Sequence, residues 1–253
     1  MRKTMAMAAI TFMQGFRTQT FRIVALVFAA LLTVSYFLKV LSVGHKDIML
    51  RSFSLTAMEV SGLLLIIFGC INGYYREKET RLQAIHLTFM SYFDHVLGRL
   101  IGNCLLIGAY VGLSAIACSG ILLMEEAWHL SFLFGAWSIM LKLFIVCAFS
   151  SLFSNLFSSP VFASLMTVFI DFAAEYAYFP LTMMSHIPTM VPNALSRFFY
   201  HLLPNYDKID LKYIAAHGTL PKASYLAETG IYTLLYFAII FLISWKAFER
   251  HEH

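Results

Sequence analysis

Residues 97–124 read LGRLIGNCLLIGAYVGLSAIACSGILLM, an apolar run of 28 residues in which Arg99 is the one charged side chain. A helix needs about 20 apolar residues to cross a hydrocarbon core roughly 30 Å thick. Two glutamates at 125–126 end the run, and a second apolar run follows at about 130–152. Two long apolar runs joined by so short a link predict a pair of antiparallel transmembrane helices.

The composition of the whole chain agrees with a membrane protein. Of its 253 residues, 60% are hydrophobic and 13% are charged, whereas a soluble domain is about half apolar and about a quarter charged. The basic residues lie at the ends of apolar runs and form no stripe with interleaved aromatics, so the net charge of +4 does not indicate nucleic-acid binding. We therefore expect an all-α membrane protein surrounded by lipid, with no nucleic-acid partner.

Six apolar segments predict six transmembrane helices within one membrane domain, residues 1–253. The predicted spans lie at about 21–41, 58–75, 97–124, 130–152, 161–179 and 229–245. Ahead of them, residues 4–20 alternate apolar and polar side chains at helical spacing, which favours an N-terminal amphipathic elbow helix on the bilayer surface. A ragged start of the first span is the alternative. Small-residue pairs at Gly98/Gly102 and Gly108/Gly112 indicate close helix packing.

The longest polar stretch, residues 180–226, forms a long loop between the fifth and sixth predicted spans. Apolar residues recur at near-helical spacing between Pro188 and Pro204, so this loop is expected to be partly structured. They are Ile187, Val191, Leu195, Phe198, Phe199 and Leu202.

The distribution of basic residues predicts the orientation in the membrane. Six spans put both termini on one side, and Lys and Arg concentrate in short cytoplasmic segments. With the N-terminus inside, the inner segments hold ten basic residues and the outer segments seven, four of them in the long loop, where charge has less effect. We expect a multi-pass protein of the cytoplasmic (inner) membrane with both termini cytoplasmic and the long loop outside.

Sequence motifs for chemistry are missing. The chain has no GxxxxGK[ST] phosphate loop, and neither HExxH nor GxSxG occurs. Its four cysteines lie inside apolar runs without CxxC spacing. The chain is therefore not expected to be an enzyme, with no catalytic residue, no metal site and no cofactor of its own.

Three ionisable residues interrupt the predicted spans: Lys142 in the fourth, and Asp171 and Glu175 in the fifth. A charge at the bilayer centre costs at least about 2.5–3.5 kcal/mol unless it finds a partner or water. Lys142 and Asp171 lie at similar distances from the turn near Phe157, so we expect them to pair. A shift of one helical turn would make Glu175 the partner instead. The pair either holds two helices together or takes part in substrate passage.

Two segments resemble export-type (type-2) ABC transporter permeases of the multicopper-enzyme-maturation branch. The first is LLPNYDKIDLK at 202–212, followed by Ala-Ala-His-Gly ending at Gly218, two tyrosines at 232 and 236, and Ala-Phe-Glu-Arg at 247–250. The second contains two glutamates and a leucine after the second span, then the run 97–102, and is similar to the family's cytoplasmic coupling segment. The chain departs from the family pattern at 89–92, and where Arg99 replaces a lysine.

This resemblance implies the permease subunit of an ABC exporter, which moves a hydrophobic or amphipathic substrate using ATP hydrolysed by a separate subunit. Its partners would be a soluble ABC ATPase, which holds ATP and Mg²⁺, and a second permease copy, most simply in a homodimer. A cytoplasmic coupling helix between spans two and three would contact the ATPase, and an ordinary basic loop is the alternative for that segment. The coupling residues would be Glu77, Glu79, Arg81, Leu82, Ile85, Phe89 and Phe93.

A different class of function is the alternative. An ion- or proton-coupled secondary carrier or channel could use Lys142, Asp171 and Glu175 and would need no ATPase. A membrane scaffold without transport is a third possibility. A neighbouring gene for a soluble ATPase with a phosphate loop would favour the exporter, while the substrate is not defined by the sequence.

Overall fold

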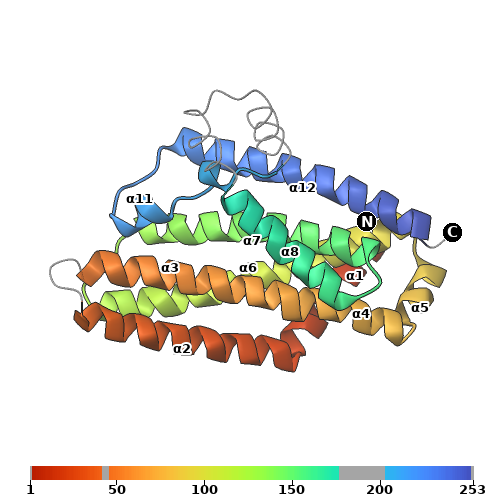
Figure 1. Cartoon of the computed structure of the whole chain (residues 1–253), viewed down its shortest axis with the longest axis horizontal. Helices are drawn as coiled ribbons and strands as arrows, with labels where there is room; N and C mark the ends of the chain where they lie inside the picture. Colours follow the sequence, from red (N-terminus) through yellow and green to blue (C-terminus); the bar gives the residue numbers. More distant parts are fainter. Residues whose placement is uncertain (1, 42–45, 177–202, 252–253) are drawn as a thin grey trace, which may run out of the picture.

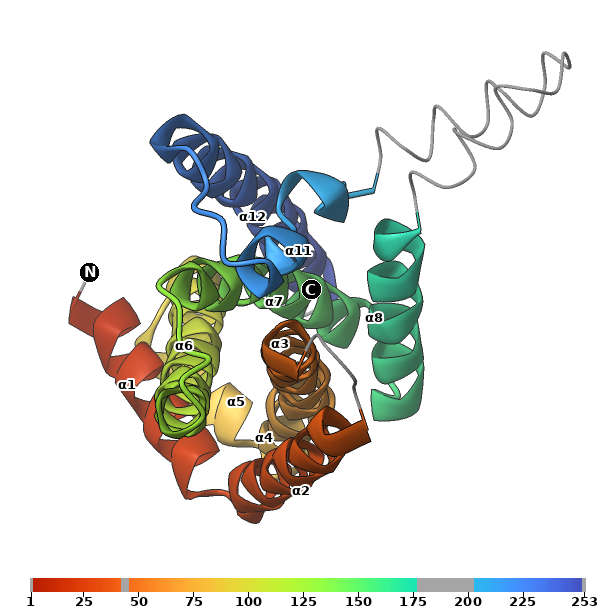
Figure 2. The same ribbon diagram turned by 90° about the vertical axis from the view of Figure 1, so that its left-hand side faces the viewer.

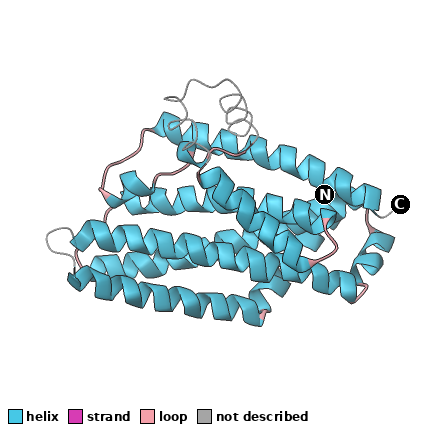
Figure 3. Ribbon diagram, in the orientation of Figure 1, coloured by secondary structure: helices cyan, strands magenta, loops and turns pink. Residues whose placement is uncertain are grey.

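Helices account for all the regular secondary structure that the computed structural model contains in its described residues, 2–41, 46–176 and 203–251 (Figure 3). They run mostly side by side as a bundle (Figure 1). In chain order they are α1 (Arg2–Arg17), α2 (Gln19–Leu41), α3 (Lys46–Leu65), the π-helix η1 (Ile66–Ile71), α4 (Asn72–Glu79), α5 (Leu82–Phe89), α6 (Tyr92–Met124), α7 (Ser131–Leu156), α8 (Pro160–Glu175), the 3-10 helix η2 (Tyr206–Lys208), α11 (Lys212–Ala216) and α12 (Ala223–His251).

Five helical stretches are long and apolar enough to cross a membrane, as a multi-pass membrane protein requires. They are Gln19–Phe37, Lys46–Glu79, Tyr92–Met124, Ser131–Leu156 and Ala223–Arg250. A helix suits this solvent because it pairs its own backbone groups where no water can. The predicted fifth span corresponds to α8, whose 16 residues do not reach that length; residues 177–179 and the expected helical stretch between Pro188 and Leu202 lie outside the described residues.

The predicted second span, 58–75, is the middle of a longer helix. α3, η1 and α4 form one continuous helical stretch from Lys46 to Glu79. The polar residues before position 58 belong to its first turns: Asp47 favours a helix N-terminus, and Arg51 Nε donates to the Asp47 carbonyl at 3.2 Å. The prediction was therefore about three turns short at this end.

α1 is a helix of its own, as the amphipathic pattern predicts, and it lies across the bundle. Figure 2 shows it lengthwise, whereas α3, α6 and α7 are strongly foreshortened in the same view. The chain turns at Thr18, whose hydroxyl donates to the Gly15 carbonyl at 2.7 Å. The buried residues of α1 pack on α6. Its position at the bilayer surface remains a prediction.

Two glycines of α6 allow α1 to pack closely against it. A Cβ at Gly98 would lie 2.7 Å from the Thr4 carbonyl oxygen, and one at Gly102 would lie 2.7 Å from the Ala8 carbonyl oxygen. At Gly112 a Cβ would meet no described atom within 4 Å. The small-residue pair Gly98/Gly102 thus packs against α1, in keeping with the role of such pairs in membranes.

α7 lies at the centre of the bundle and contacts α3, α6, α8, α11 and α12. Its large side chains Phe132 and Ile145 are fully buried. Polar contacts also fix how the helices are placed: Asn155 Nδ2 of α7 donates to Ser244 Oγ of α12 at 2.9 Å. Neighbouring helices are therefore positioned chiefly by their contacts with α7.

Gly102→Val should loosen α1, because the new Cβ would collide with the main chain of α1 and not only with a flexible side chain. Overpacking of this kind costs about 1–3 kcal/mol. We expect a lower Tm in detergent, measured by circular dichroism. Gly112→Val is the matched control, since it adds the same atoms to the same helix where there is space. An unchanged Tm for Gly102→Val would show that α1 is not held in this way.

Candidate functional site: a buried ionic cluster

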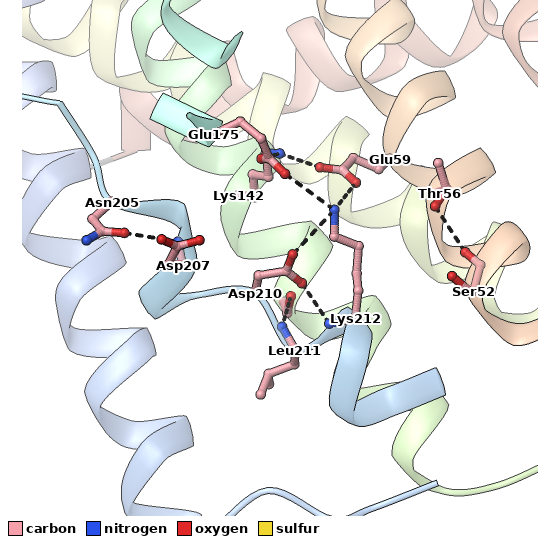
Figure 4. Close-up of polar contacts among 11 residues, drawn as sticks. Ser52, Thr56, Glu59, Lys142, Glu175, Asn205, Asp207, Asp210, Leu211 and Lys212 are labelled. Atoms are coloured by element: carbon pink, nitrogen blue, oxygen red, sulfur yellow. Dashed lines mark hydrogen bonds and ion pairs between the residues drawn. The ribbon is translucent and has the colours of Figure 1, made fainter. Parts of the chain in front are cut away.

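Lys142 lies near the middle of α7 and bridges two other helices. Its Nζ contacts a carboxylate oxygen of Glu59 in α3 and one of Glu175 in α8 (Figure 4). The Lys142 and Glu59 side chains are only 11% and 14% exposed. Charges so far from water persist only where each finds a partner, so Lys142 joins α3, α7 and α8.

A second lysine reaches the same carboxylates from outside the long helices. Lys212 Nζ, at the start of α11, lies 2.7 Å from Glu59 Oε2, 3.5 Å from Asp210 Oδ2 and 3.9 Å from Glu175 Oε1. Asp210 also accepts the Lys212 backbone N–H at 2.7 Å, which fixes the start of this short helix. Glu59 therefore lies between two lysines and links them (Figure 4).

The segment around α11 reaches this depth because α7 offers it a face of small residues. A Cβ at Gly135 would lie 2.8 Å from Ala215 Cβ, so the two chains are in close contact. Ser131 Oγ donates to the Ala215 carbonyl at 2.9 Å, and Ser138 Oγ accepts the Leu211 N–H at 3.2 Å. These three α7 residues share one helix face, and the two serines satisfy backbone groups that burial would otherwise leave unpaired.

Tyr206 covers the cluster from the same segment. Its ring is 2% exposed and its centroid lies 4.6 Å from Lys142 Nζ, a distance suited to a cation–π contact. Burial and the neighbouring charge of Asp171 raise the pKa of Tyr206 well above its ordinary value, so the phenol stays neutral. Asp171 Oδ1 and the Tyr206 hydroxyl are both buried, and these two side chains lie beside each other.

The charge of Lys212 is also stabilised by its surroundings. Burial would lower the pKa of Lys212, but the carboxylates of Glu59 and Asp210 outweigh it and raise the pKa above the ordinary value. A raised lysine pKa contributes stability below the unfolded value of about 10.4 and loses it only as the pH rises through the folded value. The Lys212–Glu59 pair is therefore intact throughout the neutral range.

The predicted pairing of Lys142 with Asp171 is wrong by one helical turn, and Glu175 is the partner, as the shifted register would have it. α7 ends at Leu156 and α8 begins at Pro160. Lys142 lies 14 residues before the first of these positions, and Glu175 lies 15 residues after the second. At about 1.5 Å per residue these two side chains reach similar depth, whereas Asp171, 11 residues after Pro160, is about 4.5 Å short of Lys142.

The ionic cluster consists of Lys142, Glu59, Glu175 and Lys212. Glu59 and Lys212 were not identified from the sequence. Glu59 lies at the edge of the predicted span 58–75, and its position within a membrane helix is evident only once the helix is known to begin at Lys46. Lys212 carries no local signal of burial, although it ends the run 202–212 on which the family resemblance rests.

The predicted coupling residues fall into separate environments. Arg99 Nη1 donates to Glu77 Oε2 at 2.7 Å in a buried pair, and the Arg99 guanidinium lies 4.6 Å from the Tyr74 ring centroid. Glu77 thus holds α4 to α6 and does not face outward. Glu79 ends α4 and is exposed, and Arg81 adopts a left-handed conformation (φ 57°) that turns the chain into α5.

α5 forms the short helix expected between the second and third spans, but it ends earlier than predicted. Leu82, Ile85 and Phe89 are 38%, 53% and 70% exposed. Phe93 belongs to α6, because Ser91 caps a new helix by accepting the backbone N–H of Asp94 at 3.2 Å. There its ring packs on Phe241 and Trp245 of α12 at 5.3 Å between centroids. The apolar stripe on α5 itself therefore has three members, and Phe93, also 38% exposed, belongs to α6.

Comparison with known proteins adds no family assignment, since no family model and no curated protein matches the sequence. Within the described residues no group of three or more His, Cys, Asp and Glu side chains could hold a metal ion. What the cluster can do is electrostatic: it ties three helices and the α11 segment together through alternating charges, and it contains carboxylates that could exchange a proton.

Lys142→Gln should strongly destabilise the bundle, because it leaves the Glu59 and Glu175 carboxylates facing each other with one cation fewer. Removing one partner of a buried pair costs about 3–5 kcal/mol. We expect a large fall in Tm in detergent, and Lys222→Gln, a change at an exposed lysine, should leave Tm unchanged. The double variant with Glu59→Gln should lose less than the sum of the single changes. Simple additivity would mean that the two side chains do not interact.

Proposed function

We propose that the chain is the permease subunit of an ABC exporter in the cytoplasmic membrane, moving a hydrophobic or amphipathic substrate. It would work as a homodimer with a separate ATPase that holds ATP and Mg²⁺. In this proposal the chain crosses the membrane six times with both termini in the cytoplasm, because α8 crosses as the fifth span in addition to the five longer helical stretches. Its 16 described helical residues rise about 24 Å, and the sequence stays apolar through Phe179.

α5 is the observation that carries this proposal. It lies at one end of the bundle, the end that also holds α1 and the last turns of α12 (Figure 1). A helix of eight residues is too short to be stable by itself, yet it exposes Leu82, Ile85 and Phe89. An apolar helix face of this kind suits a groove in a partner protein, and an ATPase subunit is the partner that the family resemblance implies.

The two ends of the chain's membrane bundle would then have different roles. α5 connects directly to α4 and α6. The buried Glu77–Arg99 pair joins these two helices near the ends that flank α5. A movement of α5 imposed by a partner would therefore pass into two long helices together. The ionic cluster around Lys142 lies further along the bundle and holds α3, α7, α8 and α11 as one unit. Such a rigid unit favours movement of whole helices over local adjustment.

A proton- or ion-coupled carrier is the alternative, and one observation favours it. Asp171 Oδ1 is buried beside the ionic cluster and Tyr206, and Asp171 forms neither of the ion pairs that hold Lys142. A carboxylate in that position could take up a proton without breaking the pairs of Lys142. Transport that follows an ion gradient and is indifferent to ATP would support the carrier.

Phe89→Asp should prevent productive contact with the ATPase while leaving the membrane helices intact, because it puts a charge on the most exposed residue of the α5 stripe. We expect loss of ATPase co-purification and at least a tenfold drop in vanadate-sensitive ATP turnover by the assembled complex. Leu220→Asp is the matched control: Leu220 is 59% exposed and follows α11, which lies at the opposite end of the bundle from α5 (Figure 1). Normal co-purification and turnover of Phe89→Asp would mean that α5 rests on lipid instead.

Cysteine labelling tests the proposed orientation. Single cysteines introduced at Lys78 and Lys208, both exposed, should react with a membrane-impermeant maleimide from opposite sides, Lys78 from the cytoplasmic side. The four native cysteines lie within helices and are at least partly buried, so replacing them with alanine gives the background. Labelling of the Lys208 position from the cytoplasmic side would reverse the topology.

A further inference from the structure

A pocket of about 320 Å³ opens beside the junction of α1 and α2, at the end of the bundle that holds α5. Its walls come from α1 and α2 on one side, η1 and α4 on another, and α6 on the third. A volume of this size is typical of small-molecule sites. The polar side chains of its wall that matter here are Gln14, Asn72, Arg76, Glu77, Arg99 and Asn103.

The π-helix and two glycines make room for this pocket. η1 interrupts the α-helical pattern over Ile66–Ile71, and such single π turns are frequent at functional sites. Gly69 and Gly73 both line the cavity. A Cβ at Gly73 would meet no described atom within 4 Å, so a side chain there can occupy the pocket without displacing its walls.

Asn103 indicates that the pocket takes a polar ligand. Its side chain is 7% exposed and lines the cavity, yet its amide makes no hydrogen bond to any described residue. The Asn103 amide is not sealed off by protein atoms but reaches the cavity, so whatever fills the cavity can bond it. Gln14, which is half-buried, and Asn72, which is exposed, also line the cavity and make no side-chain hydrogen bond within the described residues. These three amides offer N–H donors to whatever fills it.

The charge of the wall indicates an anion. Arg99 is balanced by its pair with Glu77, but Arg76 has no ion-pair partner among the described residues. One positive charge is thus left over, on a guanidinium whose planar fork matches phosphate and carboxylate oxygens. A guanidinium together with three amides supplies more donors than the two oxygens of a carboxylate need, which favours the phosphate.

Apolar side chains complete the wall beside these donors. Phe68 is 51% exposed, and both it and Leu106 line the cavity. We propose that this pocket binds the phosphate headgroup of an amphipathic molecule, with Arg76 and the amides on the phosphate and the apolar wall beside the first atoms of its tail. This site is independent of the proposed export function, because binding requires neither ATP nor a partner chain.

Titration of a monomeric lipid into the purified full chain tests the site. Dihexanoyl phosphatidic acid should bind saturably in a maltoside detergent, as measured by calorimetry. Arg76→Gln and Gly73→Leu should each weaken binding at least tenfold, the first by removing the charge and the second by filling the space. Arg250→Gln, at another exposed arginine of the same end, and Gly112→Leu, at another open glycine, should bind like the parent chain.

Two further ligands separate the sources of the phosphate. Dihexanoylglycerol lacks the phosphate and should not bind, whereas inorganic phosphate should compete only at concentrations at least tenfold higher. Equal affinity for inorganic phosphate would overturn the amphipathic ligand, and binding of dihexanoylglycerol would overturn the role of the phosphate. Unchanged binding in both Arg76→Gln and Gly73→Leu would show that this pocket is not the site.

Discussion

The ion pairs of Lys142 fix helices that lipid alone would leave free to slide. Apolar side chains gain little from one another when the solvent is itself apolar, so helix association in a membrane depends on close packing and polar contacts. Lys142 supplies such contacts to α3 and α8, and Glu59 extends them to α11 through Lys212. The pair with Glu59 does not depend on α8, whereas a slide of α8 by one turn would replace Glu175 with Asp171 at the depth of Lys142.

The long helices were predictable because the bilayer imposes their length. The runs 97–124 and 130–152 correspond closely to α6 (Tyr92–Met124) and α7 (Ser131–Leu156). The start of α3 was not predictable in this way. Lys46, Asp47 and Arg51 are polar yet helical, and hydropathy alone would assign polar residues to a loop between spans. The apolar stripe of α5 followed from its periodicity, whereas its end at Phe89 depends on the cap at Ser91, a local hydrogen bond.

The candidate site was only half accessible to sequence reasoning. The free-energy cost of an ionised side chain in the membrane singled out Lys142, Asp171 and Glu175. It does not indicate which carboxylate pairs with Lys142. Choosing Glu175 required the true ends of α7 and α8, and finding Lys212 required a contact with Glu59 that spans 153 positions. No periodicity records such a contact, because it arises from how a connecting segment folds back onto the small residues of α7.

The π-helix η1 changes the direction in which one long helix points its charges. Glu59 and Glu77 are 18 residues apart, about five turns of regular α-helix, and would share a side if the helix were uninterrupted. Instead Glu59 faces Lys142 of α7, and Glu77 faces Arg99 of α6. Because a π turn uses more residues than an α turn, η1 acts as a phase shift between the two halves. Deleting one residue within η1 would rotate every later side chain of the stretch about the helix axis. Glu59 and Glu77 could then no longer face α7 and α6 at the same time.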